Sequence, residues 1–155
     1  MELSDILSEE GVLYCTGIKS KDELLRVLSD RAAQLHERDA DAVHDALANR
    51  EAIGSTGLGN GIAVPHGKVA GMPQLRAVFA RLDKPIDFDS VDDQPVDLVM
   101  VLLAPLGAGA EHLKALSLVA RLLRTESIVD DLRRTSDPGR LYAILTAPLS
   151  AHKAA

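Results

Sequence analysis

The residues best suited to chemistry lie in a glycine-rich segment that leads into a histidine. The segment reads Thr56-Gly57-Leu58-Gly59-Asn60-Gly61-Ile62-Ala63-Val64-Pro65-His66-Gly67-Lys68. Glycine is typical where the backbone turns sharply or where another molecule approaches it closely. Its glycines are therefore candidate binding residues: Gly57, Gly59, Gly61 and Gly67. Pro65 fixes φ and removes an amide donor, so the apolar strand before it should end there or lie at a sheet edge. The imidazole of His66 is thus presented to react or to bind.

The spacing of these glycines excludes the two common nucleotide-binding loops. A Walker A loop reads G-x-x-x-x-G-K followed by Ser or Thr, whereas one residue too many separates Gly61 from Gly67 and Val69 follows the lysine. A dinucleotide-binding loop reads G-x-G-x-x-G and follows a strand, whereas this segment follows a predicted helix. The segment is therefore not a nucleotide cradle.

Of the other histidines, one is a candidate site residue. His36 and His44 fall on the polar faces of predicted helices, and His152 falls near the chain end. His112 lies at the start of a predicted helix, on the side of its apolar stripe, so it points toward the protein. This position is typical both of a semi-buried structural histidine and of a functional one, and the residues alone leave the choice open.

Three polar residues at or just before the start of the glycine segment could bind an anion. Arg50 ends a predicted helix, where a cation is favourable in any case, but if it faces His66 it would offer a bidentate donor to a phosphate. Ser55 and Thr56 are typical turn residues and could equally donate hydroxyl protons to the same anion.

A metal-dependent hydrolase is a weaker alternative. It would pair His66 and His112 with a carboxylate such as that of Glu111, but the spacing matches no metal-binding motif. A Ser-centred nucleophile motif is also lacking from the sequence. We therefore expect neither a metal nor another cofactor.

The composition indicates a single globular domain. The chain has 155 residues, a net charge of −6 and 3% aromatic residues, which does not fit a nucleic-acid-binding surface. Its single cysteine, Cys15, fits a reducing cytoplasm, and the sequence shows neither a signal peptide nor a membrane-spanning run. We expect a cytoplasmic protein with one domain at residues 1–149 and a flexible tail at 150–155.

The hydrophobic pattern predicts both strands and helices. Strands are expected at 12–18, 62–64, 75–82 and 98–104, and the last is apolar enough to be buried on both faces. Helices are expected at 21–36 behind a Ser20 capping box, at 42–51 behind an Asp41 cap, and at 111–124, 127–133 and 138–145. This order predicts an α/β/α sandwich with a mixed sheet of about four to five strands.

The run from Glu51 through Leu58-Gly59 to Ile62-Ala63-Val64-Pro65-His66-Gly67 resembles the phosphohistidine signature of the mannitol/fructose-type enzyme IIA domain. That domain is a component of the bacterial phosphoenolpyruvate-dependent phosphotransferase system. A second histidine of the family, at the start of a helix, is matched by His112-Leu113 with Leu116-Ser117. The resemblance spans about Leu3 to Leu145, and the segments 55–61, 85–88 and 94–97 are most similar to the nitrogen-regulatory branch.

The resemblance implies a reaction and a set of roles. His66 would accept a phosphoryl group from an HPr-type phosphocarrier, of the sugar or nitrogen type, and become tele-phosphohistidine. His112 would stabilise that group and Arg50 would clamp it, while Ser55, Thr56 and the glycines would form the binding surface. The phosphoryl group would then pass to a sugar-specific enzyme IIB, or its presence would control target proteins. We expect the regulatory role, since the sequence shows no fused IIB or membrane IIC domain.

Overall fold

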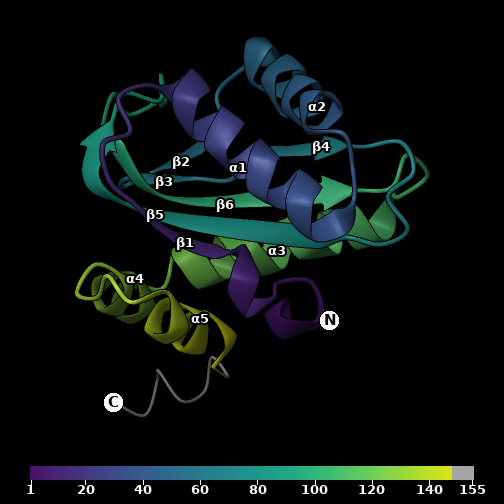
Figure 1. Ribbon diagram of the computed structural model, residues 1–155. Coiled ribbons are helices and arrows are strands. Elements are labelled where there is room, and N and C mark those ends of the chain that lie inside the picture. Colours follow the sequence, from purple (N-terminus) through teal and green to yellow (C-terminus); the bar gives the residue numbers. More distant parts are fainter. Residues whose placement is uncertain (148–155) are drawn as a thin grey trace.

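The computed structural model describes residues 1–147, whose strands form one mixed six-stranded sheet (Figure 1). The strands are β1 (Val12–Cys15), β2 (Gly57–Gly59), β3 (Ile62–Ala63), β4 (His66–Lys68), β5 (Arg76–Ile86) and β6 (Val96–Ala104). The helices are α1 (Lys21–His36), α2 (Ala40–Ile53), α3 (Ala110–Leu123), α4 (Glu126–Leu132) and α5 (Pro138–Thr146), preceded by 3-10 turns at Leu3–Asp5 and Glu9–Gly11. The predicted tail 150–155, the predicted domain end at 149 and His152 lie outside the described residues.

Strand β6 is the centre of the sheet. It pairs antiparallel with β5 along one edge, and β1 pairs parallel with the far side of β5. Along its other edge β6 pairs in parallel first with β3 and then with β4, which places His66 opposite Leu102. The break between β3 and β4 contains Pro65, which has no amide hydrogen to donate to the ladder. The prediction that the apolar strand stops at this proline is confirmed.

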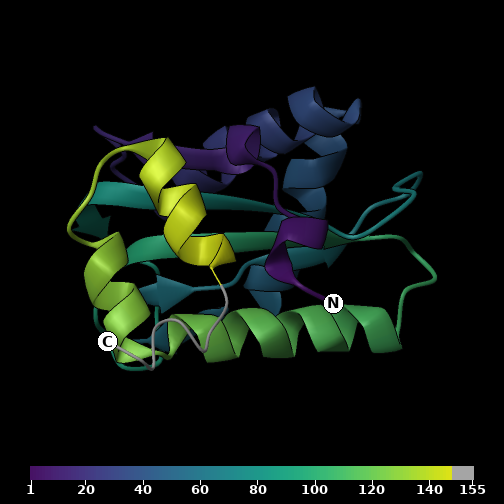
Figure 2. The same ribbon diagram turned by 90° about the horizontal axis from the view of Figure 1, so that it is seen from below.

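Helices cover both faces of the sheet, as the predicted α/β/α sandwich requires. Helices α1 and α2 lie on one face, whereas α3, α4 and α5 lie on the other (Figures 1 and 2). Successive side chains of β6 alternate between the two cores: Leu98, Met100 and Leu102 pack on the α3 side, and Val99, Val101 and Leu103 on the α1 side. The predicted burial of this strand on both faces is confirmed.

The caps of α1 and α2 show how the sequence sets their starts. Ser20 Oγ accepts from the Glu23 amide at 3.1 Å, as the capping box predicts. The α2 cap is Asp39 rather than the predicted Asp41, because the Asp39 carboxylate accepts from the Ala42 amide and the helix begins at Ala40. Asp41 instead lies in the first turn and forms an ion pair with Arg26 at 2.8 Å.

Strands β2 and β4 and the last part of β5 were absent from the expected elements. Strands β2 and β3 form a hairpin whose two-residue turn is Asn60-Gly61, with φ values of 57° and 82°. A type I′ turn needs positive φ at both positions, and Asn-Gly is its preferred sequence. Strand β5 continues beyond its expected end at residue 82, through Pro85 to Ile86, which pairs with Val96. The sheet therefore has one strand more than the upper expectation.

Candidate functional site

His66 begins β4 at the edge of the sheet beside β6, and its ring is oriented by the backbone. The ring atom Nδ1 lies 2.9 Å from the carbonyl oxygen of Val64. A carbonyl oxygen can only accept, so Nδ1 must carry the proton of this hydrogen bond. In the neutral ring, Nε2 is then left with its lone pair. The half-buried imidazole is therefore fixed in the tautomer whose nucleophilic atom is Nε2.

His112 lies on the first turn of α3 and faces the ring of His66. The two ring centres are 5.5 Å apart and their planes are nearly perpendicular, at 82°. The side chain is buried, as predicted, and its Nε2 atom has no hydrogen-bond partner among the described residues. A buried polar atom without a partner is costly. A hydrogen-bond partner for this atom would remove that cost.

The surroundings of His112 favour the neutral form of its ring. Burial, the imidazole of His66 and the ammonium of Lys68, in that order, lower the pKa of His112. Burial and the nearby charge of Arg76 lower the pKa of His36 in the same way. A neutral His112 would gain a proton more readily once negative charge arrived at His66, because an opposite charge favours the protonated ring.

These lowered pKa values predict a loss of stability in mild acid. In the unfolded chain both histidines return to an ordinary value of about 6.5, so the unfolded state binds more protons as the pH falls through that value. The free energy of unfolding should therefore decrease on acidification below about pH 6.5. Urea unfolding across this range would measure the effect, and the double substitution His36→Gln and His112→Gln should flatten it. An unchanged pH dependence in the double variant would contradict this assignment.

A hollow of about 240 Å³ joins His66 to the residues that precede it in the chain. Its lining comes from the end of α2, the loop after it, the strand before His66 and the middle of α3: Arg50, Ser55, Thr56, Gly57, Leu58, Val64, His66, Leu116 and Ala120. The guanidinium of Arg50 is anchored by one hydrogen bond, from Nη1 to the Gly54 carbonyl at 2.8 Å. Thus Arg50 and His66 share one hollow, and the ring of His112 lies against His66.

The loop hydroxyls hold the loop itself together. Ser55 Oγ donates to the Phe88 carbonyl at 3.2 Å and accepts from the Gly57 amide at 3.1 Å. The hydroxyl of Thr56 donates to the carboxylate of Glu51 and is buried. Both hydroxyls therefore already have protein partners. To donate to an anion in the hollow, each hydroxyl would first have to break its present hydrogen bond.

The glycines of the segment serve different needs. A Cβ on Gly57 would lie 2.5 Å from Ser90 Oγ, and one on Gly67 would lie 3.2 Å from the backbone of Ala46 in α2. Both positions therefore need glycine for space, which lets the loop and β4 pack closely against their neighbours. Gly59 and Gly61 have positive φ and turn the β2–β3 hairpin instead. They do not line the hollow at His66.

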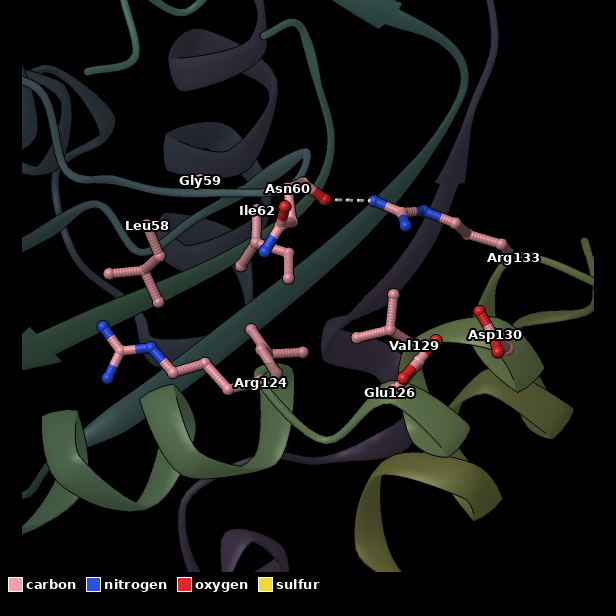
Figure 3. A pocket seen from close by; sticks show the side chains of 10 residues that line it. Leu58, Gly59, Asn60, Ile62, Arg124, Glu126, Val129, Asp130 and Arg133 are labelled. Carbon is pink, nitrogen blue, oxygen red and sulfur yellow. Dashed lines mark hydrogen bonds between the residues drawn. The ribbon is translucent and has the colours of Figure 1, made fainter. Parts of the chain in front are cut away.

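A larger hollow, of about 460 Å³, lies between the hairpin and the α3–α4 segment (Figure 3). There Arg133 donates to both carboxylate oxygens of Asp97 and to the Asn60 carbonyl at 2.7 Å. Neither His66 nor His112 lines this hollow. The chemistry therefore points to the smaller hollow, because His66 lines it and the ring of His112 faces His66.

One residue of the site was missed as a candidate. Glu51 is buried, and it follows Val43 and Leu47 at intervals of four residues along α2. That spacing places it on the buried face of the helix, so a carboxylate there needs partners. The four-residue spacing is visible in the sequence, where Glu51 was named only as the first residue of the family signature.

Two further findings concern cofactors and membranes. Among residues 1–147, no group of three or more His, Cys, Asp or Glu side chains is arranged to hold a metal ion. In the same part of the chain, no helix is both long and apolar enough to cross a bilayer.

The chain matches known proteins over nearly its whole length. The pattern of the family described as "Phosphoenolpyruvate-dependent sugar phosphotransferase system, EIIA 2" matches residues 5–147. A protein named "Nitrogen regulatory protein" from Bradyrhizobium diazoefficiens is 45% identical over 148 residues, which cover 96% of this chain and 97% of that protein. The fructose-specific EIIABC component of Bacillus subtilis is 37% identical over 149 residues, which cover 94% of this chain but 23% of that protein.

Solved structures share the same fold. The crystal structure of nitrogen regulatory protein IIA-Ntr from Neisseria meningitidis superposes with a TM-score of 0.85 at 36% identity, covering 92% of this chain and 97% of that one. The mannitol enzyme IIA of Escherichia coli was solved in complex with phosphorylated mannitol enzyme IIB. It superposes with a TM-score of 0.76 at 21% identity, covering 90% of this chain and 98% of that one. At that identity the second likeness concerns the fold alone.

Proposed function

Since this chain belongs to the EIIA 2 family of the phosphoenolpyruvate-dependent sugar phosphotransferase system, we propose that it accepts a phosphoryl group on Nε2 of His66. The observation that carries the proposal is the hydrogen bond from Nδ1 to the Val64 carbonyl. It leaves Nε2 with its lone pair, on a ring that faces His112, whose buried Nε2 has no partner among residues 1–147. We also propose that the protein works in the cytoplasm, where its single thiol is kept reduced.

The donor is an HPr-type phosphocarrier. The Nε2 lone pair attacks phosphorus, and a new N–P bond forms while the bond to the carrier's histidine breaks and leaves its electron pair on that nitrogen. The positive charge that develops on the His66 ring is stabilised by the Val64 carbonyl, which accepts from Nδ1. Phosphoryl transfer depends on alignment and charge stabilisation. His112 Nε2, carrying a proton, and the Arg50 guanidinium supply that stabilisation at the phosphoryl oxygens.

The surface around the site suits a protein partner. Ile53, at the end of the Arg50 helix, and Leu113, next to His112, have relative exposures of 84% and 68%. Large apolar side chains exposed beside a shallow hollow are typical of docking surfaces for other proteins. This supports a phosphocarrier as the donor rather than a small phosphorylated metabolite.

We propose a regulatory role of the nitrogen type for the phosphorylated state. Matches to nitrogen regulatory proteins support it, since the chain covers nearly the full length of the Bradyrhizobium relative at 45% identity. Phosphorylation would add about −1.5 to −2 charges, by analogy with phosphorylated hydroxyl residues, which changes the surface offered to a target protein. The second candidate is a sugar-specific enzyme IIA that relays phosphate to an enzyme IIB. The fructose-specific relative supports this second role.

Reconstitution separates the two roles. The full chain would be incubated with labelled phosphoenolpyruvate, enzyme I and either a sugar-type or a nitrogen-type phosphocarrier. We expect labelling to be faster with the nitrogen-type carrier, and the label to remain on this protein when a fructose-type or mannitol-type IIB is added. Rapid passage of the label to a IIB would overturn the regulatory assignment and establish the sugar-relay role.

Replacing Arg50 tests the proposed phosphate clamp. Arg50→Ala should slow phosphorylation by roughly 10- to 100-fold, somewhat less than the loss of a fully buried charge-stabilising donor, because the guanidinium is partly exposed. The rate would be measured by rapid quench with saturating phosphocarrier. Arg124→Ala is the matched control, since Arg124 is an exposed arginine on the other hollow (Figure 3). Equal phosphorylation rates for the two variants would show that Arg50 does not act as a phosphate clamp.

A further inference from the structure

A buried ion pair lies beneath the glycine loop. Lys21 Nζ is 2.9 Å from Glu51 Oε2, and the two side chains are only 19% and 4% exposed. Lys21 also donates to the Phe88 carbonyl at 3.3 Å and lies 4.5 Å from the centre of the Phe88 ring. Burying a carboxylate is costly unless it is paired and hydrogen-bonded, so the contacts of this pair indicate what it holds in place.

The carboxylate of Glu51 binds the loop as well as the lysine. Its two oxygens accept from the Thr56 amide at 3.3 and 3.2 Å, and Oε1 also accepts the Thr56 hydroxyl. Thr56 is the residue at which the chain enters the glycine segment. Because the carboxylate accepts from both backbone and side chain, it fixes the position and the direction of the loop at that residue.

Two further hydrogen bonds connect Thr56 to the ring of His66. The Thr56 carbonyl accepts from the Val64 amide at 3.0 Å. The Val64 carbonyl then accepts from Nδ1 of His66 at 2.9 Å. The contacts therefore form an unbroken series from Lys21 through Glu51, Thr56 and Val64 to the imidazole.

We propose that the Lys21–Glu51 ion pair is the positioning device of the phosphoryl acceptor. By fixing Thr56, and through it Val64, the pair holds the ring orientation and the Nδ1–H tautomer of His66. The expected effect of the ion pair on the rate of phosphoryl transfer rests on the proposed function. Its expected effect on the orientation and tautomer of the His66 ring does not. Neither Lys21 nor Glu51 lines the hollow at His66, so they are positioning residues rather than catalytic ones.

The same pair also orients the arginine. Glu51 directly follows Arg50 in the last turns of α2, and Arg50 Nη1 is bonded to the Gly54 carbonyl of the same loop. Fixing Glu51 therefore fixes the helix end from which Arg50 extends. A contact that holds a nucleophile and a charge-stabilising group together can control their alignment without touching the substrate.

The test uses substitutions that keep shape and remove charge. Glu51→Gln keeps the length and one acceptor oxygen, and Lys21→Met keeps the length of the lysine chain. Each is expected to lower the phosphorylation rate at saturating phosphocarrier by about 10- to 100-fold. The KM for the carrier should change by less than about 3-fold, because uniform binding is unaffected. Nitrogen-15 spectra of the unphosphorylated protein should show the His66 ring shifting from a single Nδ1–H tautomer toward a mixture.

Asp97→Asn is the matched control. It breaks the partly buried ion pair with Arg133 at 2.8 Å, so it should cost stability while leaving the rate and the His66 ring spectrum as in the wild type. If Glu51→Gln does not fold, Glu51→Asp keeps the charge but shortens its reach, and it should show the same losses.

Three results would overturn the inference. The first is a wild-type rate and ring spectrum in the folded Glu51 and Lys21 variants. The second is an equal loss of rate in Asp97→Asn, which would indicate general destabilisation. The third is an unchanged His66 tautomer with a lowered rate, which would place the effect elsewhere. If His66 of the wild-type protein takes no phosphate, the proposed function fails, while the ring spectra still decide the positioning role.

Discussion

Replacing His66 with alanine is expected to abolish phosphorylation of this protein. The substitution removes Nε2, the nitrogen that the Nδ1 hydrogen bond leaves with its lone pair, and His112 cannot replace it. His112 is buried and does not line the hollow, whereas the half-buried ring of His66 does. In a reconstituted system with labelled phosphoenolpyruvate, enzyme I and phosphocarrier, the variant should remain unlabelled.

His44→Ala is the matched control for that experiment. His44 lies on α2, and its ring nitrogen is 3.0 Å from a carboxylate oxygen of Asp22 rather than near His66. The control should be labelled at the wild-type rate. Label on the His66→Ala protein at the wild-type stoichiometry would show that another residue is the acceptor.

The second large effect is expected at His112. His112→Ala should slow phosphorylation by about 10²- to 10³-fold, as does the loss of a comparable preorganised donor in another enzyme. The reason is that its Nε2, which has no partner among residues 1–147, lies on the ring that faces His66, where we propose that charge develops during transfer. Because this interaction is made mainly in the transition state, the loss should appear in the rate at saturating carrier rather than in KM.

Stability must be separated from chemistry at this position. His112 is a buried residue, so alanine there also removes packing. His112→Gln keeps an amide that can donate a hydrogen bond, and it should recover part of the lost rate. Both variants would be checked by urea unfolding before the rates are compared. A wild-type rate in folded His112→Ala would show that the histidine is structural, which is the other reading that the sequence left open.

The sequence predicts the long elements well because each carries its own signal. The run Leu98 to Ala104 is apolar on both faces and becomes the central strand β6. The Ser20 capping box predicts the start of α1, and its serine forms the expected bond. Such signals are local, so they hold without knowledge of the tertiary structure.

The short strands could not be recognised in the same way. Strands β2 and β4 have three residues each, which is too short for an alternating pattern to be recognised. Both also contain glycine, which has a low strand propensity. Their pairing partners supply their stability instead. The hairpin did carry a local signal, since Asn60-Gly61 is the preferred sequence of a type I′ turn, whereas Gly59 and Gly61 were predicted as binding residues. The structure shows that Gly59 and Gly61 are needed for the turn.

The meeting of the site residues depends on topology rather than on any local pattern. His66 comes from β4, His112 from the first turn of α3 and Arg50 from the end of α2. The two histidines are brought together because β4 pairs in parallel with the end of β6, and α3 begins shortly after β6 ends. Arg50 lines the same hollow as His66, and its helix α2 packs against β4. The residue types indicated the chemistry, but only the sheet register could show that the two imidazole rings are 5.5 Å apart.

The central claim is that Nε2 of His66 is the phosphoryl acceptor, and one measurement tests it most directly. The protein would be labelled with nitrogen-15 in its histidine rings and phosphorylated from phosphoenolpyruvate through enzyme I and the phosphocarrier. Coupling between phosphorus-31 and ring nitrogen-15 then identifies the bonded atom. We predict one phosphoryl group, coupled to Nε2 of His66, with Nδ1 still hydrogen-bonded to Val64. Coupling to Nδ1 of His66, or to a nitrogen of any other histidine, would contradict the account.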